Sequence, residues 1–120
     1  MAGRVAARIF CSALAVFGTG VILGQPYPNK PIRMVTGGTG GSSDTVSRLL
    51  AQGLTSGLGQ QVIVDSRPSG VIPGQIVSAA PPDGYTLLLS SGSLWIAPLM
   101  QKTPYDAVRD FSTITLTNTA

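Results

Sequence analysis

The chain alternates short apolar runs with turns that are rich in glycine, serine and proline. Runs dominated by β-branched and aliphatic residues between such turns are typical of strands. They predict four strands, at Ile32–Thr36, Gln61–Asp65, Tyr85–Ser90 and Ser112–Asn118. The third run, YTLLLS, is apolar enough to predict burial on both faces of a sheet.

One longer stretch, Asp44–Gly57, is amphipathic and predicts a helix, because its apolar residues recur at spacings of three and four. The expected apolar face consists of Val46, Leu49, Leu50, Leu54 and Leu58. Ser42 or Ser43 is the expected N-cap residue of this helix. Gly53 lies inside it, where glycine is unfavourable, and we expect it to mark a close contact with a neighbouring element.

Shorter segments complete the expected order of elements. Gly74–Ala80 and Leu94–Gln101 predict two further helices, and Pro104–Phe111 predicts a short helical turn capped by Asp106. Strands therefore alternate with helices across short connections, which is typical of a parallel sheet with flanking helices. The predicted fold class is α/β.

Residues 1–24 have the features of an export signal and not of a folded element. Arg4 and Arg8 precede the apolar run Ile9–Leu23, which is shorter than the roughly 20 apolar residues of a membrane span. We expect cleavage after residue 24, which leaves residues 25–120 as one small exported domain. An uncleaved N-terminal anchor is the alternative.

The composition excludes several kinds of site within this chain. It contains no His and no Glu, and its single cysteine, Cys11, lies in the middle of the predicted signal. His-based catalytic triads, Glu acids and Cys/His metal clusters are therefore excluded. Of the eight Lys and Arg residues, two lie in the signal, and the remaining six are scattered among five Asp residues. This arrangement does not form the basic patch that nucleic-acid binding requires. We expect neither enzymatic activity nor a cofactor.

Two segments of glycine and serine follow predicted strands and lead into predicted helices: GGTGGSS at Gly37–Ser43 and SSGS at Ser90–Ser93. Unobstructed backbone amides, serine hydroxyls and the unpaired amides of a helix start suit a carboxylate, phosphate or sulfate. Ligands of open α/β sheets bind at the carboxyl ends of the strands, where both segments are expected. Ordinary tight turns without a ligand are the alternative at each position.

Nucleotide-binding motifs fit this sequence poorly. A P-loop requires a lysine after its glycines, and none follows here. The dinucleotide fingerprint G-x-G-x-x-G is matched by Gly38 and Gly40 but has Ser43 at its third position. Asp65 could take the place of its ribose-binding acid, and Arg67 that of a 2′-phosphate partner. A dinucleotide-dependent oxidoreductase domain is therefore an alternative function, and a truncated remnant that binds nothing is another.

Six segments, in this order along the chain, resemble the tripartite tricarboxylate transporter substrate-binding proteins, also called the Bug family of extracytoplasmic solute receptors. They are YPNKPIRMV (Tyr27–Val35), GGSSD (Gly40–Asp44), RLLAQGL (Arg48–Leu54), LGQQVIVDSRP (Leu58–Pro68), PPDGYTLLL (Pro81–Leu89) and PYDAVRDFSTITL (Pro104–Leu116). The resemblance implies a two-lobed periplasmic binding protein of type II-like fold, of which residues 25–120 form part of the N-terminal lobe. It also implies a small carboxylate ligand and delivery to membrane permease subunits.

Carried over residue by residue, the resemblance implies a binding site on the same two loops. The implied ligand-binding residues are Gly40, Gly41, Ser42, Ser43, Asp44, Ser90, Ser91, Gly92 and Ser93. Among these, Asp44 is expected to order its loop and not to touch the anion, because like charges repel.

The chain also departs from the family pattern in ways that concern the ligand. The family's proline- and aromatic-containing stretch after the first strand is replaced by Thr36–Thr39, and the loop Ser69–Gly74 is shorter. Family members are also far longer, so this chain is expected to supply one wall of a cleft. We expect it to bind a solute weakly or not at all when alone.

Overall fold

The structure is a computed structural model that describes residue 24, residues 26–68 and residues 70–117. Its described strands are β1 (Ile32–Gly37), β2 (Val62–Arg67) and β3 (Thr86–Leu89). They form one parallel sheet in the order β2-β1-β3. The predicted parallel sheet is confirmed, with its first strand at the centre.

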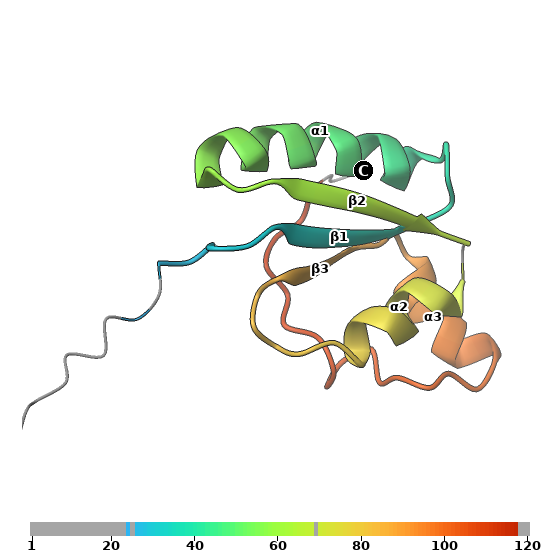
Figure 1. Cartoon of the computed structure of the whole chain (residues 1–120). Helices are drawn as coiled ribbons and strands as arrows, with labels where there is room; N and C mark the ends of the chain where they lie inside the picture. The colour runs from blue at the N-terminus through green and yellow to red at the C-terminus, as the bar shows by residue number, and fades with distance from the viewer. Residues whose placement is uncertain (1–23, 25, 69, 118–120) are drawn as a thin grey trace, which may run out of the picture.

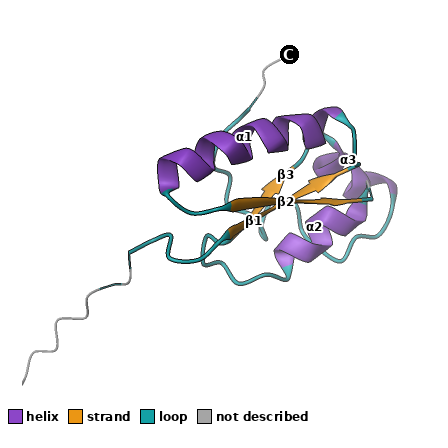
Figure 2. Cartoon of the chain, turned by 45° about the horizontal axis from the view of Figure 1, so that its top comes forward, coloured by secondary structure: helices purple, strands orange, loops and turns teal. Residues whose placement is uncertain are grey.

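Three described helices pack on this sheet: α1 (Ser42–Leu58), α2 (Val71–Ser78) and α3 (Ser93–Met100). Helix α1 covers one face of the sheet, and α2 and α3 lie against the other (Figures 1 and 2). The predicted α/β class is therefore confirmed. Within the described residues, no helix is both long enough and apolar enough to cross a bilayer. Apart from residue 24, the predicted export signal lies outside the described residues.

The core is divided by the sheet into two apolar clusters. On the α1 side, Ile32, Met34 and Val62 pack around Ala51. On the other side, a second cluster is built around buried residues of α3 and the segment that follows it, Leu94, Tyr105 and Ala107. Strand β1 contributes to both faces, because neighbouring strands and helices enclose it on every side.

The buried face of α1 differs from the predicted one. Its buried residues are Asp44, Ser47 and Ala51, whereas Leu49 is 65% exposed. Small side chains let the helix lie close to the sheet, and the leucines Leu50 and Leu54 fill its margins. The expected contact at Gly53 is absent, since an added Cβ there would meet nothing within 4 Å. The helix also begins earlier than predicted, with a glycine and not a serine at its N-cap.

Strand β3 is less buried than predicted, because it lies at an edge of the sheet. All four of its residues are only half-buried. The strand predicted at Ser112–Asn118 is wrong for the part that is described, because residues 112–117 pair with no strand. Ile114 and Leu116 are exposed there. An apolar alternating pattern forms a strand only when a neighbouring strand accepts its hydrogen bonds.

The turn predicted around Asp106 is present but does not continue into a helix. The Asp106 carboxylate accepts hydrogen bonds from the amides of Val108, at 2.9 Å, and Arg109, at 3.1 Å. This turn holds Tyr105 in the second cluster, where its ring packs edge-on against Phe111 with centroids 5.8 Å apart. Tyr105 in turn fills the space above Gly74 of α2.

Candidate functional site

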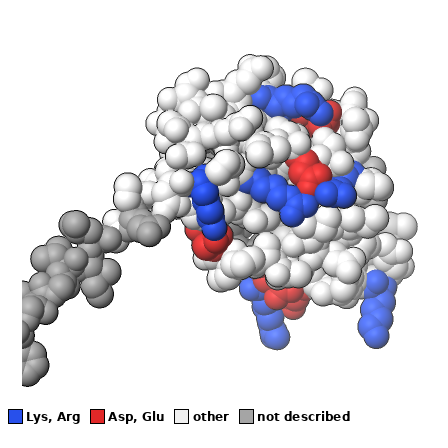
Figure 3. All heavy atoms as spheres, viewed as in Figure 1, with Lys and Arg blue, Asp and Glu red and all other residues white. Residues whose placement is uncertain are grey.

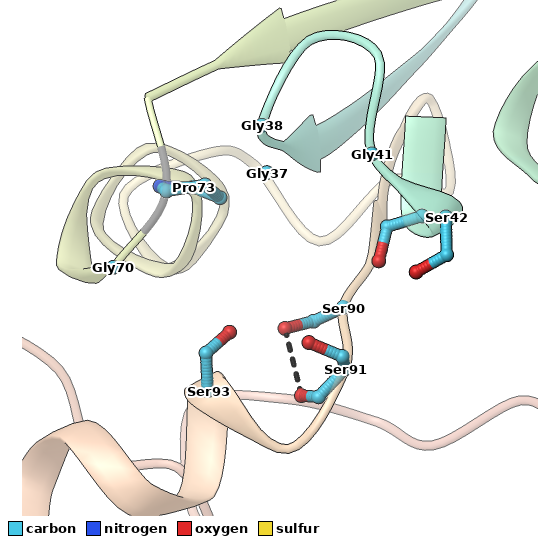
Figure 4. Close-up of a pocket in the computed structure, with 10 residues that line it drawn as sticks. Gly37, Gly38, Gly41, Ser42, Gly70, Pro73, Ser90, Ser91 and Ser93 are labelled. Atoms are coloured by element: carbon cyan, nitrogen blue, oxygen red, sulfur yellow. Dashed lines mark hydrogen bonds between the residues drawn. The ribbon is translucent and has the colours of Figure 1, made fainter. Parts of the chain in front are cut away.

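A polar cavity of about 210 Å³ lies where the strands end and the helices begin (Figure 4). It is bounded by three segments: the loop between β1 and α1, the start of α2, and the connection from β3 to α3. Its lining residues are Gly37, Gly38, Gly41, Ser42, Ser43, Gly70, Pro73, Ser90, Ser91 and Ser93. Both sequence-predicted loops therefore line the same cavity, on one edge of the sheet.

The predicted site residues divide into two groups. Those that line the cavity are Gly41, Ser42, Ser43, Ser90, Ser91 and Ser93. Gly40 and Gly92, in the same loops, and Asp44, in the first turn of α1, are not among the lining residues. Sequence reasoning missed the third wall, formed by Gly70 and Pro73 at the start of α2. The order of elements could have predicted this wall, because the loop after β2 is also a strand-to-helix connection and must reach the same sheet edge.

All three helices of the described residues begin at this cavity without a side-chain cap. Their N-cap residues are Gly41, Gly70 and Gly92, and none of the three helix starts has a side-chain capping hydrogen bond. The first backbone N–H groups of a helix have no partner within the helix, and the helix dipole places partial positive charge there. Helices α1 and α3 thus offer amide donors to one negatively charged ligand, whereas Pro73 of α2 has no N–H and α2 contributes the positive end of its dipole.

The glycines of the β1–α1 loop shape it into a tight turn. Gly38 and Gly40 have positive φ values of 66° and 79°, which residues with a side chain rarely adopt. The amide of Gly41 donates to the carbonyl of Gly38 at 3.1 Å. The amide of Gly40 donates to the Asp44 carboxylate, also at 3.1 Å. These two amides are engaged within the loop, so the donors that α1 offers to the cavity are those of Ser42 and Ser43.

The carboxylate of Asp44 is buried beneath this loop. Besides Gly40, it accepts hydrogen bonds from Arg48, with Nε 3.2 Å from Oδ2, and from the hydroxyl of Ser66 on β2. These contacts, with that from Ser66 the strongest, lower the pKa of Asp44 from 3.8 to about 2. The carboxylate is therefore ionised at neutral pH and fully engaged inside the protein. This geometry agrees with the expected loop-ordering role of Asp44.

The cavity itself carries no formal charge on any of its ten described lining residues. Charged side chains gather elsewhere on the surface in small groups of mixed sign (Figure 3). One such group holds Asp65 between two arginines: Arg67 Nε lies 2.8 Å from Oδ1, and Arg33 contacts Oδ2. Hydrogen bonds from Arg67 and Arg33 lower the pKa of Asp65. Because both carboxylate oxygens are occupied, this residue fits the ribose-binding role of the dinucleotide alternative poorly.

Aromatic side chains lie away from the polar cavity. Tyr85 packs edge-on against Tyr27, with ring centroids 5.0 Å apart. Trp95 is half exposed and lines a separate apolar groove of about 460 Å³ along β3. The polar cavity is therefore walled by glycine, serine and one proline.

Comparison with known proteins gives a consistent result. Residues 46–120 match a family described as the tripartite tricarboxylate transporter family receptor. A UPF0065 protein of Bordetella bronchiseptica is 50% identical over 95 residues, which are 75% of this chain and 28% of that protein. Protein BugT of Bordetella pertussis is 40% identical over 96 residues, or 75% of this chain and 29% of BugT. The chain thus spans somewhat more than a quarter of the length of these relatives.

Two solved structures are similar to part of this chain. A protein from R. palustris, Rpa4515, solved with adipate, is 32% identical and superposes with a TM-score of 0.50 over 52% of this chain and 22% of its own. The periplasmic binding protein BugD is 37% identical, with a TM-score of 0.48 over the same shares of the two chains.

Proposed function

Because the chain belongs to the tripartite tricarboxylate transporter receptor family, a family of periplasmic solute-binding proteins and not of enzymes, we propose that it contributes to the capture of a small carboxylate. The observation that carries this proposal is the meeting of three uncapped helix starts at one polar cavity. The adipate with which the R. palustris protein was solved supports a carboxylate as the ligand.

The proposed contacts follow from the lining residues. A carboxylate in the cavity accepts hydrogen bonds from the backbone amides of Ser42 and Ser43 and from the hydroxyls of Ser91 and Ser93, whereas the Ser90 hydroxyl donates to the Ser91 carbonyl at 3.1 Å. Hydrogen bonds to an ionised acceptor are roughly twice as strong as neutral ones. Each helix start adds about 0.3–1 kcal/mol of favourable electrostatic interaction at an exposed site. Such a site selects for negative charge without supplying a positive side chain.

Enclosure is the second requirement of the proposed mechanism. Dipoles and hydrogen bonds act weakly in water and much more strongly where water is excluded. In our proposal, residues 25–120 form one wall of a cleft. A second lobe, of the kind that the greater length of the relatives implies, forms the opposite wall and closes over the solute. The closed receptor then delivers the carboxylate to membrane permease subunits. A periplasmic location fits this role, with residues 1–24 as the export signal.

The proposal can be tested by NMR titration of the ¹⁵N-labelled chain with succinate at constant ionic strength. We expect chemical-shift changes centred on the amides of Ser42, Ser43, Ser91 and Ser93, saturating at millimolar concentration. Succinamide, which has the same shape but no charge, is the matched ligand control and should leave these amides unshifted. Equal shifts with both compounds, or none near the cavity with succinate, would contradict the proposed function.

A further inference from the structure

Two hydrogen bonds connect the end of strand β2 to the β1–α1 loop and the first turn of α1. They are made by Ser66 and Arg67. The carbonyl of Arg67 accepts a hydrogen bond from the Gly38 amide at 2.8 Å, which fixes the beginning of the loop. The hydroxyl of Ser66 donates to Oδ1 of Asp44, which lies in the first turn of α1. The loop is thus held at both ends by the same strand.

The Asp44 carboxylate links Ser66 to the loop, because it also accepts a hydrogen bond from a loop amide. Its other oxygen, Oδ2, accepts the Gly40 amide at 3.1 Å. Arg48, one turn further along α1, completes the arrangement at 3.2 Å and 3.3 Å from the two carboxylate oxygens. The Asp44 side chain is only 6% exposed, so water contributes little to holding it. Each oxygen of this carboxylate therefore depends on donors supplied by the protein itself.

These hydrogen bonds matter because the glycines give this loop unusual conformational freedom. Gly38 and Gly40 both have positive φ, and glycine populates several backbone regions about equally when nothing selects one. The contact from Asp44 draws the Gly40 amide toward the carboxylate, Gly41 donates to Gly38, and the amides of Ser42 and Ser43 remain at the cavity. Without it, the loop could turn the Gly40 amide outward or withdraw the helix start from the ligand.

We infer that Ser66 is a positioning residue for ligand binding, acting through Asp44 to hold the β1–α1 loop in its binding conformation. This inference rests on the proposed function. Ser66 is not among the residues that line the cavity, and its effect is indirect. Loss of the hydroxyl should weaken ligand binding without removing any ligand contact.

The test compares Ser66→Ala, Ser66→Thr and Thr55→Val by succinate titration of the ¹⁵N-labelled chain. Thr55 is the matched control, because its hydroxyl also joins α1 to β2, accepting the Val62 amide at 3.0 Å, but at the other end of the helix. We expect Ser66→Ala to weaken binding roughly three- to tenfold, which is the size of the net contribution of one ordinary hydrogen bond, because the loss reaches the ligand only through Asp44. Ser66→Thr keeps the hydroxyl and should restore binding, and Thr55→Val should lower stability while leaving affinity unchanged.

A second readout needs no ligand. The chemical shift of the Gly40 amide should follow the ionisation of its acceptor, Asp44. The neighbouring donors of that carboxylate are Arg48, Ser66 and Gly40 itself, and Ser66 makes the largest contribution to its low pKa. The midpoint of the Gly40 titration should therefore move from about 2 toward 3.8 in Ser66→Ala. It should remain in place in Thr55→Val.

The outcomes separate the two proposals. If the wild-type chain binds succinate and Ser66→Ala binds equally well, the positioning role is wrong and the proposed function stands. Equal weakening by Ser66→Ala and Thr55→Val would also overturn it, because general destabilisation would then explain both. If the wild-type chain shows no succinate-dependent shifts at all, the proposed function fails and the positioning role fails with it.

Discussion

Replacing Gly74 with alanine should destabilise the fold, although alanine is normally the better helix former. Gly74 is buried within α2, where the gain in helix propensity from alanine would be about 1 kcal/mol. The new Cβ, however, would lie 2.7 Å and 2.8 Å from Cε1 and Cζ of Tyr105, and 3.1 Å from Cδ1 of Leu94. Ordinary contacts of this kind lie at 3.4–4 Å, so the ring would have to move.

The structure leaves Tyr105 little room to move. The residue is 6% exposed and packs edge-on against Phe111. Forcing extra volume into a packed core costs about 1–3 kcal/mol. Subtracting the propensity gain leaves a net destabilisation of up to about 2 kcal/mol. Gly53→Ala in α1 is the matched control, because nothing lies within 4 Å of its added Cβ, and it should stabilise by about 1 kcal/mol.

Urea denaturation followed by far-ultraviolet circular dichroism measures both variants on the same scale. The two midpoints should move in opposite directions from the wild type, separated by about 1–3 kcal/mol in free energy of unfolding. A Gly74→Ala variant as stable as Gly53→Ala would refute the packing of α2 against the Tyr105 turn. It would also remove the support of the cavity's third wall, because the same helix begins at that wall.

Three further predictions concern the site: two change its charge, and the third measures binding by the chain alone. Asp44→Asn should lower the free energy of unfolding at neutral pH. A lowered carboxylate pKa stabilises the fold fully above pH 3.8, and this stability is lost as the pH falls to about 2, so the variant should lack that pH dependence. Acid titration followed by circular dichroism compares the variant with the wild type. Ser93→Asp, which places a negative charge in the cavity, should weaken succinate binding about tenfold or more, whereas Ser56→Asp on the exposed side of α1 should not. Calorimetry of the chain alone should show binding weaker than micromolar, and a micromolar dissociation constant would contradict the idea that one wall is insufficient.

Much of the fold follows directly from local sequence. The apolar runs at β1, β2 and β3 are short, bounded by turn residues and separated by helical patterns, so they specify a parallel sheet. The two serine- and glycine-rich loops could be assigned to one sheet edge for the same reason. What brings them together is topology: parallel strands place all their carboxyl ends on one side.

The parts that were missed depend on contacts between distant residues. Periodicity marked a leucine stripe on α1, but the sheet selects the adjacent stripe of Ser47 and Ala51, because small residues allow closer approach. The hydrogen bond from Ser66 to Asp44 joins residues 22 positions apart, and no local sequence pattern predicts it. The segment 112–117 has a strand-like sequence, yet its conformation depends on whether a neighbouring strand is present.

The distribution of charge explains why this site should depend on closure. In the described part of the chain, Asp44, Asp65, Asp83 and Asp106 each pair with a lysine or arginine outside the cavity. The cavity is left with amides and hydroxyls, whose attraction for an anion is small while water competes for the same hydrogen bonds. An arginine would hold a carboxylate even in an open cleft, and would release it slowly. A site made of dipoles gains most of its strength only when a second wall excludes water, so binding and closure become coupled. In the proposed receptor, reopening of the cleft would therefore be sufficient to release the solute.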